Sequence, residues 1–351
     1  MEEQIFELAR ALRERGGLLL PVFSSQPTQR VHDQYVHEGL QVEGLNLHEF
    51  SIASVRCLLR LVREHRITII HWNFYSPINP YVWFLSVFAP GLQHFRTDHG
   101  SRTLPLEAPA PWPKRLVQKL VLSRYRKVFG ISDFVVAALA QARVWTNVSR
   151  CNYFVNTDRF VPRPEERNSA RSRFAAGVNF VVLLVGQLIP EKGADVGIRA
   201  LSHLPESVVL WIVGDGPQRS ELSTLASSLS VAHRVQFFGA QWNVEPYMQA
   251  ADCLICPSVW GEAVGLVNME ALATGLPVIA SRVGGIPEYV RDGLTGFLVA
   301  PGDPAPLAER IERLRSSPAL AKQYAEHARH DAVDRFSIDR RIPEYVRAYE
   351  S

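Results

Sequence analysis

The hydrophobic residues of this chain fall into short apolar runs separated by stretches with helical spacing. In the segment 5–15, Ile5, Leu8, Ala9 and Leu12 recur at the intervals that place them on one face of a helix. Each apolar run has the length of a strand, and the runs are 18–23, 40–45, 67–71, 94–97, 127–131, 150–155, 178–185, 208–213, 235–238, 253–256, 277–280 and 296–299. Strands that alternate with helices specify parallel sheets covered by helices.

A polar stretch interrupts this alternation near the middle of the chain. The residues 163–173 carry no strand signal, so we expect them to link two domains. A chain of 351 residues is also longer than one hydrophobic core usually grows. We therefore predict an α/β protein with two doubly wound, Rossmann-like domains, an N-terminal one over residues 1–163 and a C-terminal one over residues 164–334.

Composition excludes several classes of protein. The net charge of +3 is too small to indicate a nucleic-acid partner. The acidic start Met-Glu-Glu-Gln is unlike a signal peptide, and the longest apolar stretch, 81–90, is half the length that spans a bilayer, so we expect a cytoplasmic protein. Cys253 and Cys256 lie in an apolar run, which favours small core residues over a redox or zinc site.

Glycines follow the expected strands of the second half. Gly186 and Lys192 come after the run 178–185, Gly214 follows the next run, and Gly239 the one after it. Such turns let the backbone approach an anion closely, and doubly wound sheets bind ligands at the carboxyl ends of their strands. No Walker-type Gly-Lys-Ser/Thr and no Gly-x-Gly-x-x-Gly is present, which disfavours an NTPase or a nicotinamide enzyme.

A longer motif follows the run 253–256. The segment Glu262-Ala-Val-Gly-Leu-Val-Asn-Met-Glu270, with Gly284-Gly-Ile-Pro-Glu288 after it, closely resembles the signature of the family four retaining glycosyltransferases. The residues from Gly186 to Gly193 and the turn at Gly214 resemble further landmarks, so the resemblance covers nearly the whole chain. It implies the GT-B fold, with the nucleotide-sugar bound by the C-terminal domain, and a helical segment 335–351 that returns to the N-terminal domain.

The resemblance also implies roles for individual residues. Lys192 would hold the diphosphate, and the N–H groups of Gly265 and Leu266 at a helix N-terminus would stabilise the departing nucleoside diphosphate. Glu270 would accept the ribose hydroxyls, and Glu262 would bind the sugar ring. The predicted catalytic residues are His99, Glu262 and Lys192. The predicted donor site consists of Gly186, Gln187, Lys192, Gly214, Gly239, Glu262, Ala263, Val264, Gly265, Leu266 and Glu270.

Neither a metal nor a cofactor is expected beyond the donor, a UDP-, GDP- or other NDP-sugar. Glycosyltransferases that bind a divalent cation usually carry an Asp-x-Asp, and no two aspartates of this chain stand two apart. Gln187 stands where the family has an arginine. The diphosphate should therefore be held less tightly, or another cation such as Arg282 compensates.

Three features of the first half bear on the acceptor side. His99 resembles the family's histidine at the acceptor-facing cleft, where it would hydrogen-bond the donor sugar or orient the acceptor. His71 is expected to be a packed residue at the end of a strand. The basic segment 114–127 has helical spacing and is either a sheet-covering helix with a solvated face or a surface helix attracted to an anionic membrane.

The resembled N-terminal domain begins with a central strand and a glycine-rich turn, whereas this chain starts inside the following helix. The sheet must then leave a gap between the strands 18–23 and 67–71 or close around it. We expect that Met1 is not the native start, or that the chain is a poorly active fragment.

Together these observations predict a retaining glycosyltransferase of cell-envelope or polysaccharide biosynthesis, with an unknown hydroxyl acceptor. Two alternatives remain open. A nucleotide-sugar epimerase would alter the donor without an acceptor, and an inactive nucleotide-sugar-binding protein would turn nothing over.

Overall fold

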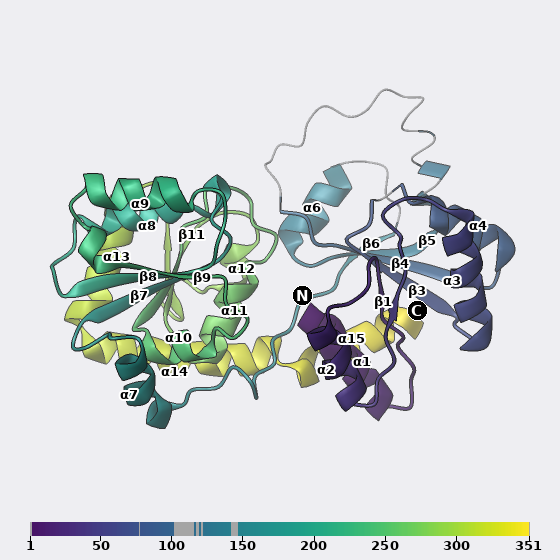
Figure 1. Cartoon of the computed structure of the whole chain (residues 1–351), viewed down its shortest axis with the longest axis horizontal. Coiled ribbons are helices and arrows are strands. Elements are labelled where there is room, and N and C mark those ends of the chain that lie inside the picture. The colour runs from purple at the N-terminus through teal and green to yellow at the C-terminus, as the bar shows by residue number, and fades with distance from the viewer. Residues whose placement is uncertain are drawn as a thin grey trace. The chain divides into compact units, whose positions relative to one another are not determined.

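The computed structural model describes residues 2–76, 78–101, 116, 119–120, 122–141 and 147–350. Their contacts divide the chain into two compact units (Figure 1). The first unit comprises Met1–His99, Pro105–Tyr153 and Ile338–Ser351, and the second comprises Gly100–Leu104 and Phe154–Ser337. The contacts thus divide at 153/154 and 337/338, where the sequence predicts boundaries at 163/164 and 334/335.

A parallel sheet of six strands forms the centre of the second unit, in the order β12-β11-β10-β7-β8-β9. Its strands are β7 (Phe180–Val185), β8 (Val208–Val213), β9 (Val235–Gly239), β10 (Cys253–Cys256), β11 (Val278–Ser281) and β12 (Gly296–Val299). All six agree with apolar runs of the second half. Valine, isoleucine and leucine point to both faces of the inner strands, as in a sheet covered on both sides.

Helices cover both faces of this sheet (Figure 1). They are α7 (Pro164–Arg173), α8 (Ala194–Leu201), α9 (Arg219–Ser228), α10 (Glu245–Ala250), α11 (Leu266–Ala273), α12 (Ile286–Tyr289), α13 (Pro304–Ser316) and α14 (Pro318–Phe336), with 3-10 turns at Pro190–Lys192 and Ala232–Arg234. The chain runs from β7 outward to β9 and then returns to β10 on the other side of β7. The strand order therefore reverses between β7 and β10, the place where doubly wound sheets bind ligands.

The segment expected to link the domains is instead a helix of the second unit, so that prediction is wrong. Arg167 and Arg171 stand one turn apart on α7 and both bind Asp252, at 2.6 and 3.2 Å. The same guanidinium groups donate to the carbonyl groups of residues 249–251, at the end of α10. These partners lie about eighty residues away in the sequence, so local polarity could not reveal them.

The described residues of the first unit form two separate parallel sheets. One pairs β1 (Val22–Phe23) with β2 (Glu43–Gly44), and the other has the order β3-β4-β5-β6. The four strands of the larger sheet are β3 (Ile69–Asn73), β4 (Gln93–Asp98), β5 (Tyr125–Gly130) and β6 (Val148–Arg150). The helices are α1 (Glu2–Glu14), α2 (Gln29–His37), α3 (Ile52–Glu64), α4 (Pro80–Phe88), α6 (Asp133–Gln141) and α15 (Ile338–Glu350).

A cavity of about 1080 Å³ separates the two sheets of the first unit. The segments around β1 and β3 line it, together with Ile5 and Leu8 of α1 and Tyr349 of α15. In the second unit the corresponding place, between β8 and β10, is filled by β7. Of the two alternatives expected for the first sheet, the structure therefore shows the gap.

The remaining expectations concern membrane helices, cysteines and the basic segment. Among the described residues, no helix is both long and apolar enough to cross a bilayer. Cys253 and Cys256 are buried in β10, as expected, and burial raises the pKa of both thiols. In the basic segment 114–127, residues 114, 115, 117, 118 and 121 lie outside the described residues, and the last three residues, 125–127, belong to strand β5 (Tyr125–Gly130) rather than to the expected helix.

Candidate functional site

An ion pair joins two predicted site residues at the strand-order reversal of the second unit. Lys192 ends the turn after β7, and Glu262 lies in the loop after the neighbouring strand β10. The Lys192 ammonium lies 2.5 Å from Oε1 of Glu262. Glu262 is buried, with 5% of its side chain exposed, whereas 30% of the Lys192 side chain reaches the surface. The ammonium is thus more exposed to solvent than the carboxylate that it pairs with.

The loop of Lys192 is fixed to the loop after β10 by backbone contacts. The amide of Val259 donates to the carbonyl group of Glu191 at 2.9 Å. Gly193 has φ +65°, and a Cβ there would lie 2.1 Å from the carbonyl oxygen of Pro257. Only glycine allows this left-handed turn with such a close backbone approach, so the position of Lys192 beside Glu262 depends on Gly193.

A serine that the sequence did not single out also binds Glu262. Ser258 Oγ is fully buried and donates to Oε1 of Glu262 at 2.8 Å, the oxygen that also contacts Lys192. On the other side, Gly285 donates its amide to the Glu262 carbonyl oxygen at 2.7 Å. Gly284 has φ +55° at this contact, and a Cβ there would lie 2.1 Å from the same oxygen. Glu262 is therefore oriented from both its side chain and its backbone.

The N-terminus of α11 follows Glu262 directly. Gly265, at φ +72°, precedes the helix, and Leu266 is its first residue. The first amides of a helix have no intrahelical acceptor, so this end can bind negative charge. Asn268 is completely buried in the first turn, and its side-chain amide makes no hydrogen bond with the described residues. Glu270 lies one turn further along α11 and is half-buried.

The glycines after β7, β8 and β9 lie in turns that are joined to the neighbouring strand or turn by backbone hydrogen bonds. The amide of Gly186 donates to the carbonyl group of Val213 at 3.0 Å, and that of Gly214 to the carbonyl group of Gly239 at 2.8 Å. A Cβ on Gly214, which has φ +148°, would lie 1.8 Å from the Gly186 carbonyl oxygen. The three predicted glycines therefore form one backbone surface at the carboxyl edge of the sheet.

The side chain of Gln187 is exposed beside this surface. Arg282, expected as a substitute cation, forms an ion pair with Asp292 at 2.6 Å. Lys192 is therefore the predicted donor-site residue that carries positive charge. Among the described residues, no group of three or more histidines, cysteines and acids could hold a metal ion.

His99 belongs to the first unit, at the end of β4. Its Nε2 lies 2.8 Å from Oδ1 of Asn73, its Nδ1 contacts the Tyr153 hydroxyl, and its ring stacks on Phe74 with centroids 4.0 Å apart. Burial lowers the pKa of His99 to about 3, and the nearby His71 contributes. The imidazole is therefore neutral at physiological pH.

His71 is a packed strand residue, as expected. Its ring nitrogens lie 2.6 Å from the hydroxyl groups of Tyr349 and Thr97. Burial lowers the pKa of His71 to about 3, so it too is neutral. Tyr349 lies on α15, so the last helix of the chain is tied to β3 inside the first unit.

Family models match both units. The model described as "Glycosyl transferases group 1" matches residues 166–331, and that described as "Glycosyltransferase Family 4" matches residues 1–159. Among curated proteins, a GDP-mannose-dependent alpha-(1-6)-phosphatidylinositol monomannoside mannosyltransferase of Mycolicibacterium smegmatis is 38% identical over 191 residues, which are 51% of this chain and 50% of that protein. A lipopolysaccharide core biosynthesis glycosyltransferase of Rhizobium meliloti is 34% identical over 49% of this chain and 50% of its own length. The chain thus matches about half the length of these curated relatives.

Solved structures extend the similarity of fold to the whole chain. A glycosyltransferase of Rickettsia africae has a TM-score of 0.87 at 21% identity and covers 99% of this chain and 94% of its own. An Anabaena protein solved with UDP-glucose has a TM-score of 0.81 at 22% identity, with 99% and 95% covered. Both similarities concern the fold, and they confirm the predicted α/β class with Rossmann-like parallel sheets of the GT-B type.

Proposed function

Because the chain belongs to the glycosyltransferases of group 1 and family 4, whose models match residues 166–331 and 1–159, we propose that it is a retaining glycosyltransferase. It moves a sugar from a nucleoside-diphosphate sugar to a hydroxyl acceptor. The observation that carries this proposal is the Lys192–Glu262 pair beside the N-terminus of α11, at the strand-order reversal of the second unit.

The second unit binds the donor. The diphosphate competes with Glu262 for the partly exposed Lys192 ammonium, and it faces the backbone amides of Gly265 and Leu266. These groups are cationic or dipolar and are fixed before the reaction. They stabilise the negative charge that grows on the leaving nucleoside diphosphate. The glycine turns after β7, β8 and β9 allow the nucleotide to approach the protein backbone closely. Glu270 accepts hydrogen bonds from the ribose hydroxyls.

Glu262 recognises the sugar rather than attacking it. Its Oε1 is shared by Lys192 and Ser258, and the residue is buried. Such an engaged carboxylate is a poor nucleophile but a well-oriented hydrogen-bond acceptor. We therefore propose front-face attack by the acceptor, assisted by the leaving phosphate, with retention of anomeric configuration.

His99 acts as a neutral hydrogen-bonding group on the acceptor side. Its low pKa excludes a role as a proton donor near neutral pH. Both ring nitrogens already have partners, Asn73 and Tyr153. To reach a sugar hydroxyl, the imidazole must exchange one of them, so its contribution is orientation rather than proton transfer.

The acceptor is a glycan, glycolipid or small molecule of the cell envelope. Relatives named for phosphatidylinositol mannoside, lipopolysaccharide core and D-inositol 3-phosphate support this class. The enzyme acts in the cytoplasm, at the inner face of the membrane, with the basic segment 114–127 as one point of contact. It needs neither a metal nor a nucleic-acid partner.

The test is a mass-spectrometric assay with a panel of nucleotide-sugars, with and without acceptors. Release of nucleoside diphosphate together with a glycosylated acceptor is expected. An altered nucleotide-sugar formed without an acceptor would indicate an epimerase. Donor binding in calorimetry with no turnover of any donor would leave only a nucleotide-sugar-binding protein.

A further inference from the structure

Helix α4 is apolar on its outer side as well as on the side it packs into the first unit. Tyr81, Val82 and Leu85 are buried, but Trp83, Val87 and Phe88 are 45%, 50% and 57% exposed. None of its nine residues is charged. A surface helix normally carries polar residues on its solvent side, so the sequence of α4 is not explained by the core of this unit.

These side chains continue onto the neighbouring helix α3. The ring of Phe84 lies 5.1 Å from that of Trp83, 6.4 Å from that of Phe88 and 5.0 Å from that of Phe50, which precedes α3. Phe50 is 41% exposed and Ile52, the first residue of α3, is 49% exposed. We name this surface the α3–α4 patch; it consists of Phe50, Ile52, Trp83, Phe84, Val87 and Phe88. Contiguous exposed apolar surface of this kind marks an interaction site.

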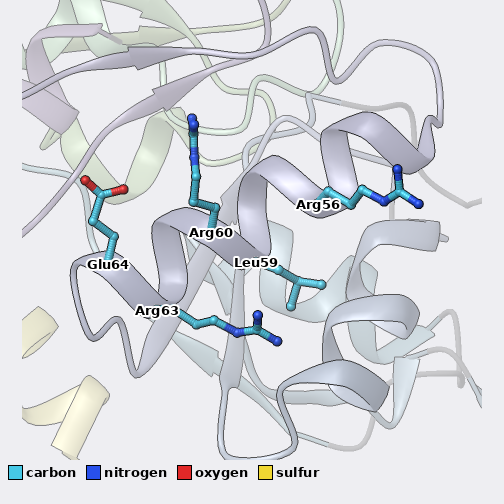
Figure 2. Close-up of a pocket in the computed structure, with 5 residues that line it drawn as sticks. All are labelled: Arg56, Leu59, Arg60, Arg63 and Glu64. Carbon is cyan, nitrogen blue, oxygen red and sulfur yellow. The ribbon is translucent and has the colours of Figure 1, made fainter.

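A row of arginines extends from the patch along α3. Arg56, Arg60 and Arg63 follow Ile52 at helical spacing and are exposed, around a shallow pocket of about 460 Å³ (Figure 2). No described carboxylate lies within ion-pair distance of these three guanidinium groups; the acid that also lines the pocket, Glu64, points away from Arg56 and Arg63. The positive charge of the row is therefore available to an external anion.

We propose that the α3–α4 patch docks the first unit onto an anionic lipid bilayer. Trp83, Phe88 and Phe50 enter the boundary between headgroups and acyl chains, and the arginine row binds lipid phosphates. Bulky aromatic side chains next to unpaired cations form the pattern of an interfacial anchor. The stretch from Pro80 to Gln93 contains no acidic residue that would repel the headgroups.

This surface is distinct from the basic segment 114–127 and from the donor site in the second unit. Docking therefore does not depend on glycosyl transfer, and a failure of one proposal leaves the other standing. Docking would hold the first unit, which is the acceptor-side unit, at a membrane that contains anionic lipid.

The test is cosedimentation of the full chain with phosphatidylcholine vesicles, with and without phosphatidylglycerol. The wild type should bind the anionic vesicles. Trp83→Ser with Phe88→Ser should lower the partition coefficient about tenfold or more, because both aromatic side chains are lost from the interface. Trp242→Ser is the matched control, since Trp242 is 70% exposed in the second unit, and it should bind like the wild type.

The arginine row is tested separately. Arg60→Gln with Arg63→Gln should weaken binding to anionic vesicles about fivefold for each arginine, and the loss should vanish at high salt. Lys322→Gln with Arg199→Gln removes the same charge from the second unit and should change nothing.

A second readout is quenching of tryptophan fluorescence by brominated phosphatidylcholine. It should fall in Trp83→Phe, a variant that keeps the apolar surface and should still bind. Equal binding by the Trp83→Ser/Phe88→Ser variant, with its fold intact by circular dichroism, would overturn the proposal. The proposal would also be overturned if the wild type did not bind vesicles and light scattering showed that it self-associates through the same residues.

Discussion

The Lys192 ammonium lies 2.5 Å from the Glu262 carboxylate, and the two residues follow neighbouring strands of the sheet, β7 and β10. The two residues are seventy positions apart in the sequence and meet in space because the strand order reverses between β7 and β10, which places these strands side by side. The pair holds a partly exposed ammonium against a buried carboxylate. This relationship determines what the removal of Lys192 should do.

Lys192→Ala should lower kcat by at least about a hundredfold, with a smaller change in the KM for the donor. The negative charge on the phosphate next to Lys192 grows as the glycosidic bond breaks. The loss of Lys192 should therefore raise the free energy of the transition state more than that of the bound donor. Steady-state kinetics with the donor identified by the panel give both constants. Lys322→Ala, an exposed lysine on α14, is the control. An unchanged kcat would remove Lys192 from the reaction.

Glu270→Ala should weaken donor binding by about 2–3 kcal/mol, or roughly thirtyfold to more than a hundredfold in Kd. The ribose hydroxyls would lose a charged acceptor in a half-buried place on α11. Isothermal calorimetry with the nucleoside diphosphate measures the loss. Glu221→Ala on α9 serves as the control because Glu221 is exposed and lies outside the predicted site. Equal affinity in the two variants would contradict the role of Glu270.

Activity should persist in excess EDTA, because the leaving-group charge is assigned to Lys192 and the N-terminus of α11 rather than to a metal. The measurement compares initial rates before and after chelation and after dialysis against metal-free buffer. A loss of activity that is reversed by adding magnesium or manganese would show that a cation takes part. The donor-site assignments would then need a place for it.

Sequence reasoning predicted the second unit better than the first. Its strands are long apolar runs such as Val208–Val213, buried on both faces, and the run coincides with β8. The positions of the candidate residues on the following loops could be anticipated because glycines and charges mark the strand ends. Ser258 escaped notice, since a serine shows nothing of its partner until the fold places it 2.8 Å from Glu262.

The first unit was harder to predict for a physical reason. The apolar run 18–23 yields only a two-residue strand, Val22–Phe23, whose partner is the equally short β2 and whose other edge faces the cavity rather than a strand. The sequence of α7 has the polarity of a linker because its fold depends on Asp252, far along the chain. Both differences arise from long-range pairing, which local pattern does not report.

The first unit should lose stability in mild acid before the second. Burial lowers the pKa of His71 to about 3 and of His94 to about 4, below the 6.5 of an exposed histidine. The unfolded chain therefore binds more protons between these values, so stability is complete above pH 6.5 and falls as the pH drops toward 3. At pH 5 each such histidine costs about 2 kcal/mol.

Hydrogen exchange between pH 7 and pH 5 tests this expectation. Peptides of β3 and β4 should lose protection more steeply than those of β7 and β8. His94→Gln should flatten the pH dependence, since its amide oxygen can still accept the Trp72 indole N–H now bound at 3.1 Å. His203→Gln, an exposed histidine of the second unit, should not. Equal acid sensitivity of the two units would contradict the neutral, buried state of His71 and His94.

Filling the cavity between β1 and β3 should stabilise the first unit. The cavity measures about 1080 Å³, and β1 and β3 are not paired with each other across it. Ile69 and Ile70 of β3 are only half-buried there, whereas four of the six residues of β7, in the matching place of the second unit, are fully buried. An added parallel strand would bury this apolar surface and pair backbone groups of both edges, each pair worth about 1 kcal/mol.

The variant carries a copy of the strand Phe180–Val185 and a glycine-containing turn in front of α1, because β7 is joined to β8 through α8 in the same way. We expect a rise in the melting temperature of several degrees and stronger exchange protection of Ile69–Asn73. An extension of the same length with serine and asparagine in place of the apolar residues is the control, since it offers a backbone but no side chains to bury. A rise with both extensions would assign the effect to length alone. No rise with either would mean that the edges of β1 and β3 are too far apart, or too differently inclined, for one strand to bridge them.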